Sequence, residues 1–211
     1  MSAPTHSSTD GRIAIVVHAD RVRVLVVGAG PVAERKAMSF ADRGAVVRVV
    51  APRAAPGLIA AAAAGKLDLV LRGYQSADIA DAELVIAATN DRATNARVAA
   101  DARSAHRLCN VADAAEEGSF SSISQTANGA LLVAVGANGV PSAASRILTA
   151  IGSRFDERYD DALVALRALR ERLLTRGGRE EWERATTELI GEDFIERVED
   201  GRLLRAVVRW P

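Results

Sequence analysis

A strand, a glycine-rich loop and a helix follow one another directly near the start of the chain, and this succession constrains the fold most. The apolar run Val22–Val27 leads into Gly28-Ala29-Gly30-Pro31-Val32-Ala33, and a helix to Arg43 is predicted to follow. Gly44 ends this helix, and Val46–Val50 is the next β-branched run. Two strands joined by one helix at this spacing indicate a βαβ unit, which belongs to parallel sheets.

The same alternation of strands and helices continues as far as Val111. It predicts a parallel sheet with right-handed crossovers, and therefore an α/β fold with a Rossmann-type domain. Further strands are predicted at Ile13–Val17, Leu67–Leu71, Leu84–Ala88 and Arg107–Val111, and further helices at Gly57–Ala64 and Asn95–Ser104.

The pattern changes after the Rossmann-type domain. Two strand-like runs separated by a turn predict a β-hairpin, and apolar residues recurring at three and four residues predict helices after it. The hairpin strands are Ser119–Ser124 and Ala130–Val135, and the helices run from Arg154 to Gly177 and from Glu180 to Ile190.

Four regions are therefore predicted: a disordered tail (1–11), the Rossmann-type domain (12–117), a hairpin segment (118–152) and a helical domain (153–211). An isolated hairpin is marginal in water, so we expect the hairpin segment to pair with a second copy in a homodimer.

Charge and composition limit the partners. Lys plus Arg (27) equals Asp plus Glu (27), which leaves no net field to attract nucleic acid or an anionic membrane. The lone Cys109 excludes an internal disulfide and fits a reducing compartment. Residues 1–11 lack the apolar core of a signal peptide, and no apolar run approaches the roughly 20 residues that cross a bilayer. The predicted location is the cytoplasm.

The glycine loop has the residue types that a dinucleotide pyrophosphate needs. Gly28 permits a tight turn, and Gly30 lets the backbone approach a phosphate. The small Ala33 lets the helix pack closely, while Pro31 and Val32 open a helix whose N–H groups face the phosphates. The loop is therefore predicted to bind a dinucleotide.

The acidic residue that usually holds the adenosine ribose is missing, because the second strand ends Val50-Ala51-Pro52-Arg53. Two explanations stay open: Arg53 binds the 2′-phosphate of NADP, or main-chain groups hold the ribose. A second cofactor edge is predicted at Thr89 and Asn90, where another strand ends. These residues and Asp91 also suit the cap of the following helix, and the two roles are compatible.

Together these segments resemble the siroheme synthase family, in its precorrin-2 dehydrogenase/ferrochelatase domain. The resemblance covers nearly the whole chain from Gly11 in the same order. It rests on the glycine loop from Val26 to Lys36, the segment Ile86–Asp91 with Asn95, the motif Cys-Asn-Val-Ala-Asp at 109–113, and the hairpin residues Ser119, Phe120 and 132–135.

The resemblance implies NAD-dependent oxidation of precorrin-2 to sirohydrochlorin, followed in some members by insertion of ferrous iron. It also implies a ribose held without an acidic residue, which favours NAD over NADP and places Pro52 and Arg53 at the cofactor. Asp113 matches the family's functional aspartate and follows a strand at the carboxyl edge of the sheet, where a carboxylate can act as general base. Metal ligands stay unassigned.

The substrate carries many carboxylates, which a neutral protein meets with local basic residues. Arg146 is the best-placed candidate, together with Asn138 in the preceding loop. Weaker candidates are Arg35, Lys36 and Arg154. The loop 136–142 departs from the family, which usually has serine or threonine early and a Ser-Pro order later. This departure puts the iron-insertion step in doubt.

A second hypothesis is a non-catalytic NAD(H)-sensing module. Its nucleotide-binding segments would look the same, but it needs neither Asp113 nor the arginine-bearing segment around Arg146.

Overall fold

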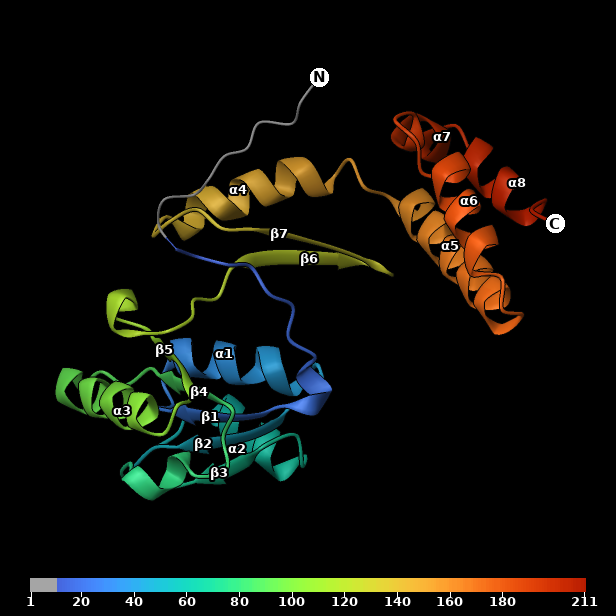
Figure 1. The fold of residues 1–211 in the computed structure, drawn as a ribbon. Coiled ribbons are helices and arrows are strands. Elements are labelled where there is room, and N and C mark those ends of the chain that lie inside the picture. The colour runs from blue at the N-terminus through green and yellow to red at the C-terminus, as the bar shows by residue number, and fades with distance from the viewer. Residues whose placement is uncertain (1–10) are drawn as a thin grey trace. The chain divides into compact units, whose positions relative to one another are not determined.

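Five parallel strands form one sheet in the N-terminal unit of this computed structural model, which describes residues 11–211 (Figure 1). The strands are β1 (Arg23–Val27), β2 (Val46–Val50), β3 (Asp68–Val70), β4 (Leu84–Ala87) and β5 (Leu108–Val111). Their order across the sheet is β3-β2-β1-β4-β5. The chain divides into two units, Met1–Ser122 and Ile123–Pro211. Of the predicted tail, only Gly11 lies within the described residues.

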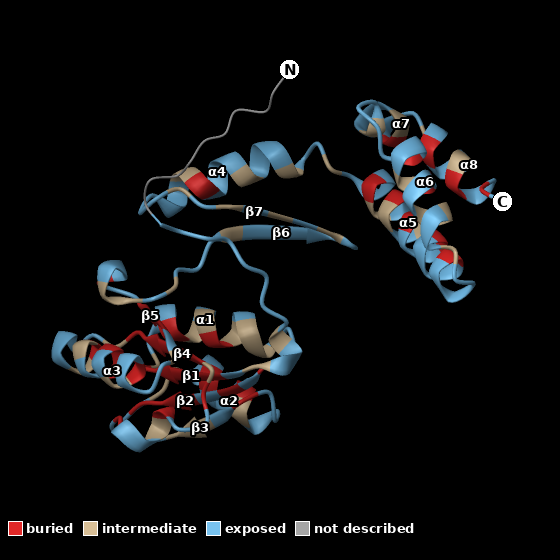
Figure 2. Cartoon of the chain, in the orientation of Figure 1, coloured by how far each residue is buried: buried red, intermediate tan, exposed pale blue. Residues whose placement is uncertain are grey.

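Helices cover both faces of this sheet, as right-handed crossovers require. The side chains of each strand alternate between the two faces, and in the central strands β1 and β4 both sets are buried (Figure 2). Val24 and Val26 of β1 share a core with α1 (Pro31–Ala41) and α2 (Pro56–Ala63). Leu25 and Val27 share the other core with α3 (Arg92–Ser104). The predicted Rossmann-type α/β fold is confirmed.

Short 3-10 helices connect several of these elements. They are η1 (Ala19–Arg21), η2 (Ser76–Ile79) and η3 (Ala115–Glu117).

The strand predicted at Ile13–Val17 is wrong. These residues have no regular structure, and Ile13 is 85% exposed and Val16 70% exposed. β-branched residues favour an extended backbone, but a strand also needs a hydrogen-bonded neighbour, and the described sheet pairs none of its strands with this segment.

The strand predicted at Ser119–Ser124 is also misplaced, because its first residues are bound to β5. The amides of Ser119 and Phe120 both donate to the carbonyl of Cys109, at 2.7 and 3.2 Å. The Cys109 amide donates in return to the Ser119 hydroxyl, at 2.8 Å. The hairpin therefore begins only at Ser124.

The second unit starts with that antiparallel hairpin, β6 (Ser124–Asn128) and β7 (Leu131–Val135). A tight turn at Gly129, with φ +53°, joins the strands. Helix α4 (Pro141–Gly152) packs against both strands (Figure 1). We did not predict α4, although proline at its first position is a helix-start signal.

Four helices complete the second unit: α5 (Glu157–Thr175), α6 (Arg179–Leu189), α7 (Phe194–Glu199) and α8 (Arg202–Val208). The predicted apolar stripe of α5 is buried, with Tyr159, Leu166 and Leu173 each at most 6% exposed. The short helices α7 and α8 were not predicted, yet Val198, Leu203 and Val207 complete this core. The division at residue 152 into a hairpin segment and a helical domain stays a prediction.

Candidate functional site

The sheet order reverses between β1 and β4, and the loops that leave their carboxyl ends carry most of the predicted cofactor residues. Helix α1 leaves β1 on one face of the sheet and α3 leaves β4 on the other, which makes this the switch point where α/β sheets bind ligands.

Gly28 lies directly against the loop after β4. A Cβ at this position would lie 2.7 Å from the carbonyl carbon of Ala88 and 2.9 Å from the amide nitrogen of Thr89. The φ of Gly28 is +112°, which side-chain-bearing residues rarely adopt. Backbone packing between β1 and β4 therefore requires this glycine.

Gly30 is the N-cap of α1 and has a different environment. Its φ is −79°, and a Cβ there would meet no atom of the described chain within 4 Å. Pro31 follows at the first helical position, Val32 is 41% exposed, and Ala33 is fully buried against the sheet. The open space in front of a helix N-terminus fits a pyrophosphate, which the first N–H groups of the helix can bind.

The end of β2 offers no carboxylate, as the sequence predicts. Ala51 is buried, and Pro52 and Arg53 are exposed in the bend that follows. A ribose at this position would meet the main chain of this bend and the guanidinium of Arg53 rather than an acidic side chain.

A buried amide joins the loop after β4 to the loop after β5. Asn95, on the first turn of α3, is completely buried. Its Nδ2 donates to the carbonyl of Thr89 at 3.1 Å and to Oδ1 of Asp113 at 3.0 Å. Its Oδ1 accepts from the Thr89 amide at 3.1 Å and lies 2.7 Å from Thr89 Oγ1. The structure thus brings Thr89 and Asp113 together through Asn95.

Asn95 was named in the segment that carries the family resemblance, but not among the predicted site residues. The sequence contains a further signal for it. It shares one helical face with Val98, Ala99 and Ala102, and all three are buried in the core. A polar residue in register with an apolar stripe needs buried hydrogen-bond partners.

Asp91 is the N-cap of α3, a role that the sequence allowed in addition to cofactor binding. Its carboxylate accepts from the amides of Ala93 and Thr94, at 3.2 and 3.3 Å, and from the Thr94 hydroxyl. These hydrogen bonds lower the pKa of Asp91, and the bond from the Thr94 hydroxyl has the largest effect. Asn90 is exposed next to this cap, and its cofactor role stays a prediction.

Asp113 lies just beyond β5. It is exposed to solvent, and its carboxylate accepts a hydrogen bond from Asn95. In β5 itself, Asn110 donates to the carbonyl of Phe120 at 3.1 Å. Cys109 is buried, and burial raises the pKa of its thiol to about 11. The thiol is therefore protonated at neutral pH and is not a nucleophile.

The predicted substrate residues lie in the second unit. Asn138, with φ +21°, belongs to the turn before α4, and Arg146 is exposed on α4. Of the other basic candidates, Arg35 and Arg154 are exposed, whereas Lys36 is half-buried and donates to Ser122 Oγ at 3.0 Å. Burial lowers the pKa of Lys36. The substrate roles stay predictions.

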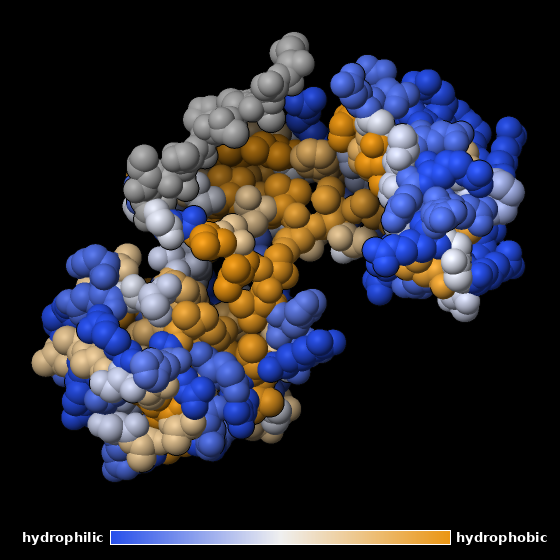
Figure 3. Space-filling model, in the orientation of Figure 1, coloured by the Kyte–Doolittle hydropathy of each residue, from blue (hydrophilic) through white to orange (hydrophobic). Residues whose placement is uncertain are grey.

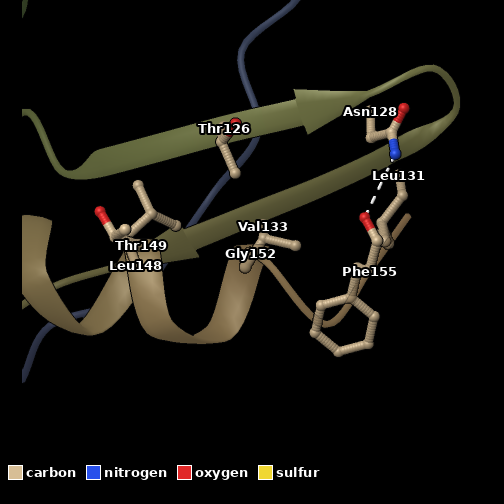
Figure 4. Close-up of a pocket in the computed structure, with 8 residues that line it drawn as sticks. All are labelled: Thr126, Asn128, Leu131, Val133, Leu148, Thr149, Gly152 and Phe155. Atoms are coloured by element: carbon tan, nitrogen blue, oxygen red, sulfur yellow. Dashed lines mark hydrogen bonds between the residues drawn. The ribbon is translucent and has the colours of Figure 1, made fainter. Parts of the chain in front are cut away.

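The second unit also holds an open cavity of about 340 Å³ between the hairpin and α4 (Figure 4). Thr126 and Val133 line it from the hairpin, and Leu148 and Thr149 line it from α4. None of the predicted site residues lines this cavity. Among the described residues, no three His, Cys, Asp or Glu side chains are grouped to hold a metal ion.

Comparison with known proteins bears on this arrangement. A family model described as "Putative NAD(P)-binding" matches residues 15–124, which is more than half of the chain. The chain belongs to this NAD(P)-binding family. The matched region contains Gly28, Thr89, Asn95 and Asp113, and ends before the second unit's helices.

Several relatives of this NAD(P)-binding chain are siroheme synthases. That of Pseudomonas putida is 51% identical over 92 residues, which are 44% of this chain and 20% of the relative. That of Azotobacter vinelandii is 41% identical over 128 residues, which are 61% of this chain and 28% of the relative. The chain thus spans less than a third of the length of these relatives.

A solved structure is similar over both units. The structure described as "SirC, precorrin-2 dehydrogenase" matches with a TM-score of 0.72 and 25% identity, over 94% of this chain and all of that chain. These matches confirm the resemblance to the siroheme synthase family, in its precorrin-2 dehydrogenase domain. They also confirm a dinucleotide cofactor of the NAD(P) class.

No helix among residues 11–211 is both long and apolar enough to cross a membrane.

Proposed function

We propose that the chain is an NAD-dependent dehydrogenase that oxidises precorrin-2 to sirohydrochlorin. The observation that carries this proposal is the position of Asp113. It follows β5, next to the switch-point strand β4, so it lies at the same edge of the sheet as the glycine loop. The match to a precorrin-2 dehydrogenase over both units supports the same substrate.

The reaction removes two hydrogens and, with them, two electrons from the macrocycle. Bound NAD would supply the acceptor for one hydrogen and both electrons, transferred as a hydride. The second hydrogen leaves as a proton, and a base must take it as the new double bond forms. Asp113 is the proposed general base, because its exposed carboxylate can both approach the substrate and pass the proton to water.

The cofactor half of the site is assigned to residues at the carboxyl ends of β1, β2 and β4. Gly30, Pro31, Val32 and Ala33 would receive the pyrophosphate at the start of α1, and Gly28 shapes the turn before it. In further support, Pro52 and Arg53 follow β2, and Thr89 and Asn90 follow β4. We propose NAD rather than NADP, and the ratio of their dissociation constants tests this choice.

Asn138 and Arg146 of the second unit are the proposed substrate-binding residues. Both are exposed, and a guanidinium on a helix surface can pair bidentately with a substrate carboxylate. An Arg146→Ala variant should raise the KM for precorrin-2 and leave NAD binding unchanged.

A homodimer is part of the proposal. One face of the hairpin is covered by α4, whereas the other face presents Ala127, Leu132 and Ala134 to solvent. Figure 3 displays apolar surface around α4, in contrast to the mainly hydrophilic bundle α5–α8. The exposed apolar side chains of this region are Ile123, Leu132, Val140, Ile147 and Ile151.

The proposed location is the cytoplasm, in keeping with a lone reduced cysteine.

The direct test is an anaerobic reaction of the purified chain with precorrin-2 and NAD. The proposal expects NADH and sirohydrochlorin in equal amounts. Bound NAD without turnover would instead support the nucleotide-sensing module. Ferrous ion added after NADH formation stops tests iron insertion as a second step, because siroheme has its own absorption spectrum.

A further inference from the structure

The side chain of Asn95 hydrogen-bonds to both backbone groups of Thr89, its amide and its carbonyl. The Thr89 amide can only donate and the Thr89 carbonyl can only accept, so the two bonds fix which end of the Asn95 amide is oxygen and which is nitrogen. The second N–H of Nδ2 then necessarily points at Asp113, 3.0 Å away. The orientation of this donor is therefore set by the backbone.

The contact defines which oxygen of Asp113 is available. Oδ1 accepts from Asn95 and keeps this bond whether or not the carboxyl carries a proton, because a protonated carboxyl still has an acceptor oxygen. The other oxygen, Oδ2, is the one that remains to receive a proton. Burial of Asn95 makes this arrangement rigid, since a buried amide without its partners would be costly.

The same side chain connects Asp113 to the cofactor edge. Thr89 follows Ala88, whose carbonyl lies against Gly28 at the start of the glycine loop. A continuous series of backbone and side-chain contacts therefore runs from the glycine loop through Thr89 and Asn95 to Asp113. Each contact lies within the first unit.

From this geometry we infer that Asn95 is a positioning residue, which aims Asp113 Oδ2 at the substrate in fixed register with the cofactor. The inference rests on the proposed function, because it gives Asn95 a role only if Asp113 removes a proton. Asn95 itself touches neither the substrate nor the reacting atoms, and acts through Asp113 alone.

A double-mutant cycle separates positioning from a structural role. Single-turnover rates are measured with saturating NAD and precorrin-2 for the full-length wild type, Asn95→Ala, Asp113→Ala and the double variant. We expect Asn95→Ala to lower the rate at least about tenfold in the wild-type background, because a small misplacement of a catalytic group is costly. In the Asp113→Ala background the same change should lower the rate less than about twofold, since residues that act as one unit are not additive.

Tyr74→Phe is the matched control. It removes a 2.9 Å hydrogen bond to Asp101, also on α3, without touching Thr89 or Asp113. Its rate should stay within about twofold of the wild type, as for a substitution away from the reacting groups. If Asn95→Ala does not fold, Asn95→Asp replaces it. This variant keeps an acceptor for the Thr89 amide, removes the donors to the Thr89 carbonyl and to Asp113, and places a second carboxylate beside Asp113.

The outcomes distinguish the inference from the function on which it rests. An equal rate loss from Asn95→Ala in both backgrounds, or a wild-type rate in Asn95→Asp, overturns the positioning role alone. A wild-type rate in Asp113→Ala overturns the role of Asp113 and the inference with it. No turnover by the wild type overturns the proposed function and, with it, the inference.

Discussion

The backbone of Ala88 closes over the α-carbon of Gly28, so that a side chain on Gly28 would lie 2.7 Å from the Ala88 carbonyl carbon. Two residues further on, a side chain on Gly30 would meet nothing within 4 Å in the described chain. The two glycines of one loop therefore have different reasons to be there. Gly28 is required by the fold, whereas Gly30 leaves room for a ligand.

Gly28→Ala should destabilise the protein itself. The new methyl group would overlap the loop after β4, and the alanine would have to adopt a φ of +112°. Strain and overpacking of this kind cost at least about 2 kcal/mol in the free energy of unfolding. Urea unfolding followed by circular dichroism measures the loss, and an unchanged midpoint would contradict it.

Gly30→Ala should leave the fold intact and impair the cofactor. Its φ of −79° suits alanine, so the free energy of unfolding should fall by less than about 1 kcal/mol. NAD affinity should drop at least about tenfold, because the methyl group occupies the space proposed for the pyrophosphate. Calorimetric titration with NAD checks this, and wild-type affinity would remove the pyrophosphate from this position.

Cys109 should make the stability of the protein sensitive to alkaline pH. Burial raises the pKa of the folded thiol from 9.0 to about 11, so between these values the unfolded chain loses a proton that the folded chain keeps. The contribution is complete below pH 9 and declines as pH rises toward 11. The difference in free energy of unfolding between the wild type and Cys109→Ala should therefore shrink over this range. A constant difference would contradict a buried, protonated thiol.

Leu132→Arg should dissociate the proposed homodimer. Leu132 is 43% exposed on the hairpin face that α4 does not cover, and an unpaired charge is costly in an apolar interface. Val164→Arg is the control, since Val164 is 53% exposed on α5, outside the hairpin. Light scattering should give a dimer mass for the control and a monomer mass for Leu132→Arg. A monomeric wild type would reject the dimer.

Local patterns in the sequence predicted the five strands of the parallel sheet in the first unit. The strand at Val46–Val50 was predicted with the bounds that the structure has, because the β-branched run and the glycine before it agree with the burial of Val47, Val49 and Val50. At Ile13–Val17 the same residue types misled us, since pairing with a neighbouring strand depends on the rest of the sheet. Short helices such as α7 and α8 contain too few turns to display a periodicity.

The candidate site was predicted only in part for a related reason. The glycine loop and Asp113 follow strands, and the carboxyl ends of parallel strands meet at one edge, so their proximity can be inferred from sequence. The link through Asn95 cannot, because it depends on where α3 places one side chain 18 residues before Asp113.

The rate of precorrin-2 oxidation by wild-type and Asp113→Ala protein, under anaerobic conditions with saturating NAD, tests the central claim most directly. Formation of NADH and sirohydrochlorin is followed by absorbance, and NAD affinity is measured on the same samples. We predict turnover by the wild type and a rate at least about a hundredfold lower for Asp113→Ala, with unchanged NAD affinity, as expected for loss of a general base. Equal rates for the two proteins, or no turnover by wild-type protein that binds NAD, would contradict the claim.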